Sequence, residues 1–445
     1  MSGFAENIDI KNSFREKFEK FENSLNGSSK SKIHEIRKNA FALFEKSGFP
    51  ERKDEEYKYT NIGKALEKNF KFQYQDELPL ISREVFDKYR VAGIDAYELV
   101  FINGQYVSEL STATLEAGFS IMDLNDAYGH FPAEINDHFS AYAKITSDPF
   151  VALNTAFSKH GTFIKVNDNK VVDKPVLVYH FSNTTGNAVS YPRNLILIGK
   201  NAEATLVDYF ICEGKTLTNG VTEAFVSENA GLEYYKIQTD LTPETFYIGT
   251  TQIYQQQNSR VNTYTITLDG NMVRNNLNIS LDGENCETHM YGLYLLHGTT
   301  HVDNHTLVDH RKANSFSNEL YKGIMNDQST GVFNGKIYVQ QDAQKTNAFQ
   351  SNKNIILNDE ASVNTKPQLE IWADDVKCSH GCTVGQLDDE QVFYLRSRGL
   401  HEDSAKAMLL IAFINDILEN MKIDILKESI SEKILARLHK DFIFN

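Results

Sequence analysis

The chain has 445 residues, 41% of them hydrophobic and 11% aromatic, and 60 acidic against 45 basic residues give it a net charge of −15. This balance argues against a nucleic-acid-binding protein and against a protein that binds membranes through a polybasic surface. No stretch approaches the roughly 20 apolar residues of a membrane span, no signal peptide is evident, and four cysteines are too few for a disulfide framework, so we expect a cytoplasmic protein with free thiols.

Residues 1–160 are predicted to form a mixed, mainly helical N-terminal domain. Two apolar stripes recur at helical spacing: Phe14, Phe18, Phe21 and Leu25, then Ile33, Ile36, Ala40 and Phe44. Residues 98–107 predict a β-hairpin around Asn103-Gly104, and Asp148-Pro149 predicts the start of a further helix.

Residues 161–387 are predicted to form a β-rich core, because many segments alternate with a period of two. A small residue after a polar turn opens a strand at intervals of 28, 29 and 27 residues: Ala202, Ala230, Ser259 and Cys286. Similar openings follow at Thr330 and Ala361, 44 and 31 residues further on. Such a period is typical of a solenoid whose stacked turns share one core. An ordinary β-sandwich is the alternative, and the 44-residue step argues for it.

Residues 388–445 are predicted to be helical again. A short helix over 388–396 ends at Gly399, and a second begins near Asp403-Ser404. The second helix is apolar almost all round, which predicts burial on more than one side. The last helix carries one apolar stripe, which we expect to pack within the chain or to meet a partner: Leu426, Ile430, Ile434 and Leu438.

The densest chemical cluster is Lys377-Cys-Ser-His-Gly-Cys382, in which Cys378, His380 and Cys382 are spaced i, i+2, i+4. On a strand these side chains point to one face, and thiolate and imidazole are ligands of zinc and iron. Gly381 breaks this pattern if it ends the strand. A fourth ligand must come from elsewhere. The alternative is that these are small buried residues of a solenoid turn.

Two further clusters carry weaker signals. Residues 297–310 contain four histidines, and His301, Asp303 and His305 alternate. They indicate either a metal site or, as we favour, a polar ladder whose members hydrogen-bond to one another. Glu370, Asp374 and Asp375 resemble the carboxylates of a polysaccharide-cleaving β-helix.

Nucleotide-binding motifs are absent from the sequence. Residues 214–216 end a Walker A pattern, but Tyr209 stands where its first glycine belongs.

Five segments give the chain a resemblance to a known family: 55–61, 150–157, 297–310, 366–386 and 392–400. Together they resemble the SufB/SufD family of iron–sulfur cluster assembly scaffold proteins. Residues 378–383 and 394–399 are similar to the SufD branch and differ from the SufB pattern. Family members commonly have alanine at the position of Cys382, so no family role is carried over to it.

The resemblance implies a right-handed parallel β-helix flanked by helical regions, in a non-enzymatic scaffold subunit. It implies pairing with SufB through the β-helix and docking of the ATPase SufC on residues 388–445. It implies that Cys378 and His380 take part in transient iron or nascent-cluster binding shared with SufB, with Cys382 as a possible extra ligand.

No cofactor is expected to be tightly bound to the isolated chain. A flavin in the complex and a homodimer of the isolated chain are left open. Two alternatives remain: a polysaccharide-active β-helix enzyme, and a standalone zinc protein that uses Cys378, His380 and Cys382.

Overall fold

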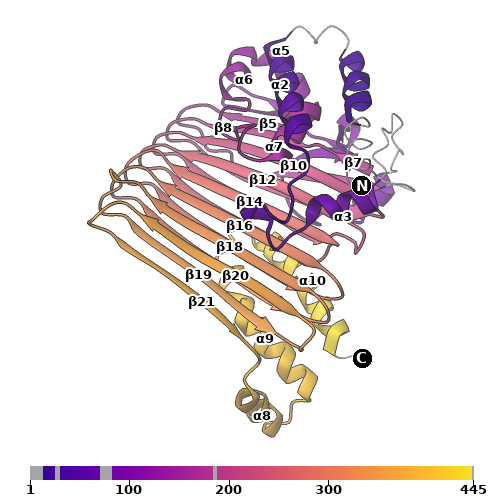
Figure 1. Cartoon of the computed structure of the whole chain (residues 1–445), viewed down its shortest axis with the longest axis vertical. Coiled ribbons are helices and arrows are strands. Elements are labelled where there is room, and N and C mark those ends of the chain that lie inside the picture. Colours follow the sequence, from indigo (N-terminus) through magenta and orange to yellow (C-terminus); the bar gives the residue numbers. More distant parts are fainter. Residues whose placement is uncertain (1–13, 26–30, 71–82, 184–187, 443–445) are drawn as a thin grey trace.

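The computed structural model describes residues 14–25, 31–70, 83–183 and 188–442, with side chains up to residue 438. Its core is a parallel β-solenoid in which consecutive strands alternate between two facing sheets (Figure 1). Sheet A runs in the order β2 (Gln105–Tyr106), β1 (Tyr97–Ile102), β6 (Val176–Asn183), β9 (Glu203–Glu213), β11 (Gly231–Asp240), β13 (Arg260–Thr267), β15 (Glu287–Leu296), β17 (Phe316–Met325), β19 (Asn347–Ile356), β21 (Lys377–Gly385).

Sheet B lies opposite, and each turn of the solenoid adds one strand to each sheet. Its order is β20 (Ser362–Ile371), β18 (Thr330–Val339), β16 (His301–His310), β14 (Met272–Leu281), β12 (Phe246–Gln255), β10 (Thr216–Val226), β8 (Arg193–Ile198), β5 (Thr162–Val166), β4 (Phe119–Asp123), β3 (Thr114–Leu115), with β7 (Ala188–Ser190) beside β10. The predicted solenoid is therefore confirmed, and the sandwich alternative is wrong.

The predicted strand openings mark one corner of the solenoid. Each opening follows a residue with positive φ, which asparagine tolerates better than most residues: Asn201, Asn229, Asn258 and Asn285. The side chains of these asparagines form a ladder, in which each Nδ2 donates to the Oδ1 of the asparagine one turn earlier at 2.8 to 3.2 Å. The corner continues at Asn314 and Lys345. Thr330 and Ala361 instead open strands of sheet B, so the 44-residue step crosses from one sheet to the other.

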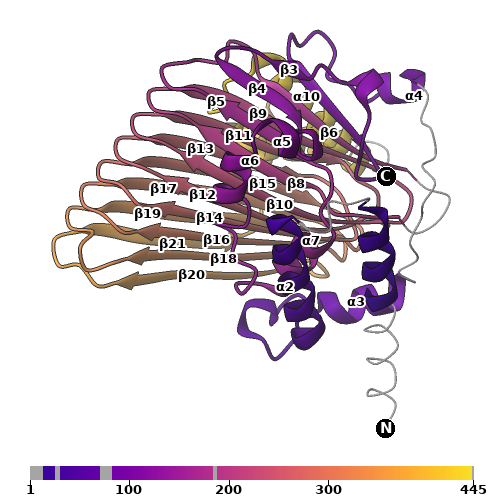
Figure 2. The same cartoon turned by 90° about the horizontal axis from the view of Figure 1, so that it is seen from above.

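Most of the N-terminal region covers the first turns of sheet B (Figure 2), whereas residues 83–91 pack on sheet A, where Phe86 contacts Tyr179 of β6. It contains a helix over 14–24, α2 (Lys32–Ser47), η2 (Glu55–Tyr57), α3 (Ile62–Asn69), α4 (Arg83–Asp87), η3 (Ser108–Leu110), α5 (Leu124–His130), α6 (Pro132–His138) and α7 (Pro149–Phe157). Asp148 caps α7 by accepting the Phe150 N–H at 2.7 Å. The predicted hairpin is confirmed, since β1 and β2 pair antiparallel around Asn103 and Gly104, both with positive φ.

The C-terminal helices are α8 (Asp389–Ser397), α9 (Glu402–Leu418) and α10 (Asp424–Phe442). The stripe on α10 packs with α9 on the outer face of sheet A, so it is part of the core of this chain. The prediction that α9 is buried on more than one side is wrong. Leu410 and Ile414 are buried against sheet A, whereas Met408 is 55% exposed, because nothing in the described chain covers that face.

No helix in the described residues is both long and apolar enough to cross a membrane. The division of the chain at residues 160 and 387 stays a prediction.

Candidate functional site

The cysteine and histidine cluster lies on β21, the last strand of sheet A. Cys378, His380 and Cys382 pair in register with three residues of β19 whose side chains are buried in the solenoid: Ala348, Gln350 and Asn352. Side chains at paired positions of a parallel sheet point to the same side. The cluster therefore faces inward on the open end of the solenoid. β21 runs through Gly381 without a break.

The three side chains do not close around one ion. Strand residues two apart are separated by about 6.6 Å, which places Cys378 and Cys382 about 13 Å apart. Within the described residues, no group of three His, Cys, Asp or Glu side chains is placed to hold a metal ion. A standalone zinc site made of Cys378, His380 and Cys382 is therefore not supported by this geometry.

The environments of the three side chains differ. Burial raises the pKa of the Cys378 thiol, only partly offset by a hydrogen bond involving the backbone of Ala348. Cys382 is exposed and its Sγ donates to Thr365 Oγ1 of β20 at 3.3 Å. His380 is exposed at the rim. Cys378 and His380 can therefore meet a ligand or a partner that approaches the open end.

The open end also exposes apolar side chains. Trp372 is 64% exposed and Val384 is 48% exposed, and Ile371 is also exposed. Each sheet ends here, in β20 and β21, with one edge unpaired in the described chain. Unpaired strand edges and exposed apolar groups favour association with another chain.

Sequence reasoning missed two polar residues in the lumen beneath His380. Gln350 and Glu319 stand in its register column, on β19 and β17, and are almost fully buried. Gln350 Nε2 donates to Glu319 Oε2 at 2.7 Å. Burial raises the pKa of Glu319 to about 7, although Thr306 and Gln350 oppose the shift. The signal in the sequence that identifies them is their spacing. Residues 319, 350 and 380 are separated by 31 and 30 residues, which is about one turn of the solenoid each.

The histidine stretch forms β16 and contacts the N-terminal region. The Thr60 hydroxyl donates to Asp303 Oδ2 at 2.5 Å and lies 2.8 Å from His301 Nε2. Arg274 Nη1 donates to Asp303 Oδ2 at 2.8 Å and to the backbone oxygen of Glu56 at 2.7 Å. The favoured interpretation as a polar ladder holds for Asp303, which pairs with His305 on its own strand and with Arg274 one turn earlier, and these contacts hold the 56–60 segment on the solenoid.

The charged groups and the burial around this stretch shift the pKa values of its members in different ways. Burial opposes ionisation of Asp303, but His305 and Arg274 outweigh it and lower the pKa of that carboxyl. Burial lowers the pKa of His301, and it lowers the pKa of His310 to about 3 inside the lumen. His310 Nε2 lies 2.8 Å from Ser317 Oγ. These side chains have separate partners, so they do not form one metal site.

The carboxylates proposed for sugar cleavage do not converge either. Glu370 forms an ion pair with Lys336 at 2.5 Å. Asp374 and Asp375 lie in the turn between β20 and β21, where the Asp375 backbone bonds to Gln344 Oε1 and to the Lys345 N–H. This arrangement gives no support to a pair of catalytic carboxylates.

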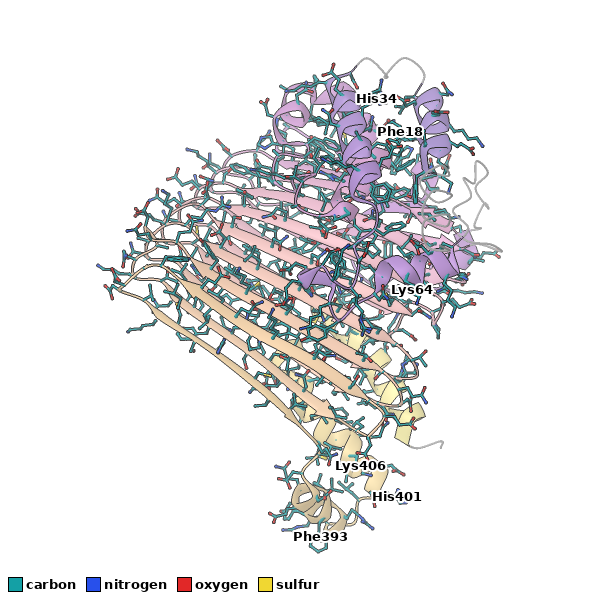
Figure 3. All side chains as sticks on the ribbon, in the orientation of Figure 1. Phe18, His34, Lys64, Phe393, His401 and Lys406 are labelled. Carbon is teal, nitrogen blue, oxygen red and sulfur yellow. The ribbon has the colours of Figure 1, made fainter. Side chains whose placement is uncertain are left out.

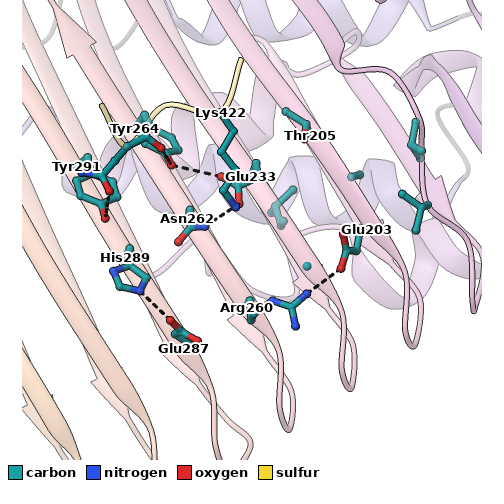
Figure 4. Close-up of a pocket in the computed structure, with 16 residues that line it drawn as sticks. Glu203, Thr205, Glu233, Arg260, Asn262, Tyr264, Glu287, His289, Tyr291 and Lys422 are labelled. Carbon is teal, nitrogen blue, oxygen red and sulfur yellow. Dashed lines mark hydrogen bonds and ion pairs between the residues drawn. The ribbon is translucent and has the colours of Figure 1, made fainter. Parts of the chain in front are cut away.

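A polar cavity of about 510 Å³ lies on the outer face of sheet A, beside the link between α9 and α10 (Figure 4). Its charged side chains pair with one another: Arg260 with Glu203, His289 with Glu287, and Lys422 with Glu233. Every charged side chain labelled in Figure 4 belongs to one of these pairs, so this cavity offers no free set of ligands.

A second exposed apolar surface lies on α8 and α9. Phe393 is 72% exposed and points away from the solenoid at the far end of the molecule (Figure 3). Tyr394, Leu400 and Met408 are exposed as well, and we call these four residues the α8–α9 patch.

Comparisons with known proteins agree with this architecture. Residues 180–413 match the family described as "SUF system FeS cluster assembly, SufBD core domain", and residues 8–178 match the "SufBD protein N-terminal region". The iron–sulfur cluster assembly protein SufD of Escherichia coli is 32% identical over 88% of this chain and 90% of its own length.

Two further relatives are similarly complete. An iron–sulfur cluster assembly SufBD family protein of Synechocystis is 28% identical over 93% of both chains. The chloroplastic protein ABCI7 of Arabidopsis thaliana is 27% identical over 90% of this chain and 86% of its own length. This chain therefore belongs to the SufBD family of iron–sulfur cluster assembly proteins.

Proposed function

We propose that this chain is a scaffold subunit of a SUF assembly complex, pairing with SufB and docking the ATPase SufC. Iron and the nascent cluster are its cargo, bound where the two scaffold subunits meet. The observation that carries the proposal is the inward row of Cys378, His380 and Cys382 on the terminal strand β21, whose outer edge has no partner strand in the described chain. Because these residues alone do not enclose an ion, a partner chain must complete the site.

Pairing with SufB is assigned to the open end of the solenoid. The free edges of β20 and β21 and the exposed Trp372 and Val384 support this assignment. A second solenoid placed on this end would cover the apolar groups and bring its own ligands to Cys378 and His380.

Docking of SufC is assigned to the α8–α9 patch. The stripe of α10 is already buried against sheet A, so it offers no docking surface. The patch is attached directly to β21 through the short segment 386–388. ATP binding by SufC would therefore pull on the strand that carries Cys378 and His380.

The chemistry follows from the two side chains. His380 would bind iron through a neutral imidazole nitrogen, and Cys378 would bind as thiolate. Since the pKa of Cys378 is raised, its thiol keeps its proton in the free chain, and metal binding must release that proton. Rearrangement of the interface would expose both groups to incoming iron or sulfide.

The test replaces His380 in a complex purified after co-expression with the host's SufB and SufC. His380→Ala should leave the complex assembled by gel filtration but lower the iron and sulfide bound per complex by about tenfold or more. Ser379→Ala, its exposed neighbour on the same strand, is the matched control and should behave like the unchanged protein. Loss of assembly in His380→Ala, or full cluster content, would contradict the proposed role.

A further inference from the structure

A column of three polar side chains runs from the open end into the lumen. His380, Gln350 and Glu319 occupy the same register position on β21, β19 and β17. Neighbouring strands lie about 4.8 Å apart, so the three residues occupy adjacent positions along the solenoid axis. Gln350 is 3% exposed and Glu319 is 1% exposed, whereas His380 is at the exposed rim.

The side-chain amide of Gln350 is held from two directions. From below, its Nε2 donates to Glu319 Oε2 at 2.7 Å. From the opposite sheet, Gly335 of β18 leaves room for it, since a Cβ at that position would lie 2.3 Å from Nε2 and 2.9 Å from Cδ of Gln350. With Nε2 donating to Glu319, Oε1 is the amide atom that is left to accept from another group.

This orientation leaves Gln350 Oε1 buried and without a hydrogen-bond partner in the described chain. A buried carbonyl without a partner is costly. The amide nitrogen of Gln350 already donates its hydrogen bond to Glu319. The next polar side chain of the column, toward the open end, is that of His380. An imidazole N–H is a donor that can meet this oxygen.

We propose that Gln350 is a positioning residue for His380: its Oε1 accepts one ring N–H and thereby leaves the other ring nitrogen unprotonated for the metal. The nitrogen of a histidine that binds metal is set by the hydrogen bond that the other nitrogen makes. Glu319 contributes by fixing which end of the amide faces His380. This inference rests on the proposed metal role of His380.

The first test is spectroscopic and uses the full-length chain. Ring ¹⁵N chemical shifts of His380, recorded above pH 8, should report one dominant neutral tautomer. Gln350→Leu should shift them toward the mixture of tautomers of a free imidazole. Gln350→Glu retains an acceptor and should preserve the single tautomer. The matched control is Gln238→Leu, which removes another buried lumen amide from the distant strand β11.

A second variant covers the case in which Gln350→Leu does not fold. Gly335→Ala displaces the amide without removing it and should produce the same change in the His380 ring shifts. Unchanged ring shifts in Gly335→Ala and in a folded Gln350→Leu chain would overturn the inference.

Cluster content separates this inference from the proposed function. In the complex co-expressed with SufB and SufC, Gln350→Leu should lower bound iron and sulfide about tenfold, and Gln350→Glu should restore most of it. If Gln350→Leu changes the His380 ring shifts but the His380→Ala complex keeps its full iron and sulfide content, Gln350 positions the ring and His380 does not bind the metal. If the ring shifts stay unchanged but the His380→Ala complex loses iron and sulfide, His380 binds the metal and Gln350 does not position it.

Discussion

Glu319 makes the stability of the protein depend on pH. Burial raises its pKa from 4.5 to about 7 in the folded chain. Between these values the unfolded chain loses the proton and the folded chain keeps it, so stability is full below pH 4.5 and is lost as the pH rises through 7. Glu319→Gln has no proton to lose in this range, so its stability should not fall as the pH rises through 7. We expect the variant to gain about 3 kcal/mol relative to the unchanged protein between pH 4.5 and pH 8.

Urea unfolding at a series of pH values measures this difference. Glu284→Gln, at an exposed corner of the solenoid, is the control and should follow the unchanged protein. Parallel pH profiles for Glu319→Gln and the unchanged protein would show that the carboxyl is not held in its neutral form.

The ion pair of Arg274 with Asp303 gives a second prediction for individual residues. Both side chains are almost fully buried, at 2% and 1% exposure. Arg274→Met leaves the buried carboxylate without its guanidinium partner and should lower the free energy of unfolding by about 3–5 kcal/mol. The double variant Arg274→Met/Asp303→Leu should be less destabilised than the single one. A double variant that unfolds more easily than Arg274→Met would contradict this account.

Individual site residues were predictable only where the sequence places them on one strand. Cys378, His380 and Cys382 share β21, so their spacing predicts a common face. Gln350 and Glu319 join them only through the register of neighbouring strands, which the 44-residue step obscured. Likewise, nothing local in the sequence indicates that Arg274 contacts the histidine stretch.

The asparagine corner is the element that sets the period of the solenoid. Asn258 has φ of 58° and its side chain bonds to Asn229 at 2.9 Å. Asn258→Ala loses both ladder bonds, to Asn229 and from Asn285, and also forces alanine into the left-handed region, which adds a cost of about 1–2 kcal/mol. Asn258→Gly loses only the two ladder bonds and should cost less. Equal thermal stability of the two variants would show that backbone strain plays no part.

Helix α10 gives a prediction about packing. Ile430 is fully buried between the helix and sheet A, so Ile430→Ala should lower the free energy of unfolding by about 2–5 kcal/mol. Leu435→Ala, on the exposed side of the same helix, should cost far less. Similar losses for both variants in denaturant unfolding would mean that α10 is not held as described.

The helical elements show where periodicity suffices and where it does not. The stripe of α10 correctly predicted one buried face. The apolar residues all round α9 predicted burial on several sides, but Met408 is exposed. Hydropathy reports which residues avoid water, and it does not distinguish a face covered within the chain from one left for a partner.

At the scale of the whole molecule, two apolar surfaces lie apart. The open end presents Trp372 and Val384, and the α8–α9 patch presents Phe393 and Met408. Removal of residues 403–445 would uncover the outer face of sheet A and confuse loss of docking with loss of folding. Point substitutions on exposed side chains avoid this difficulty.

The most direct measurement is therefore co-purification of the tagged chain with the host's SufB and SufC. The unchanged chain should bring down both partners. Phe393→Asp/Met408→Asp should lose SufC and keep SufB, and Trp372→Asp/Val384→Asp should lose SufB and keep SufC. If neither partner is retained by the unchanged chain, or if neither double variant loses its partner, the chain is not a scaffold with two separate docking surfaces.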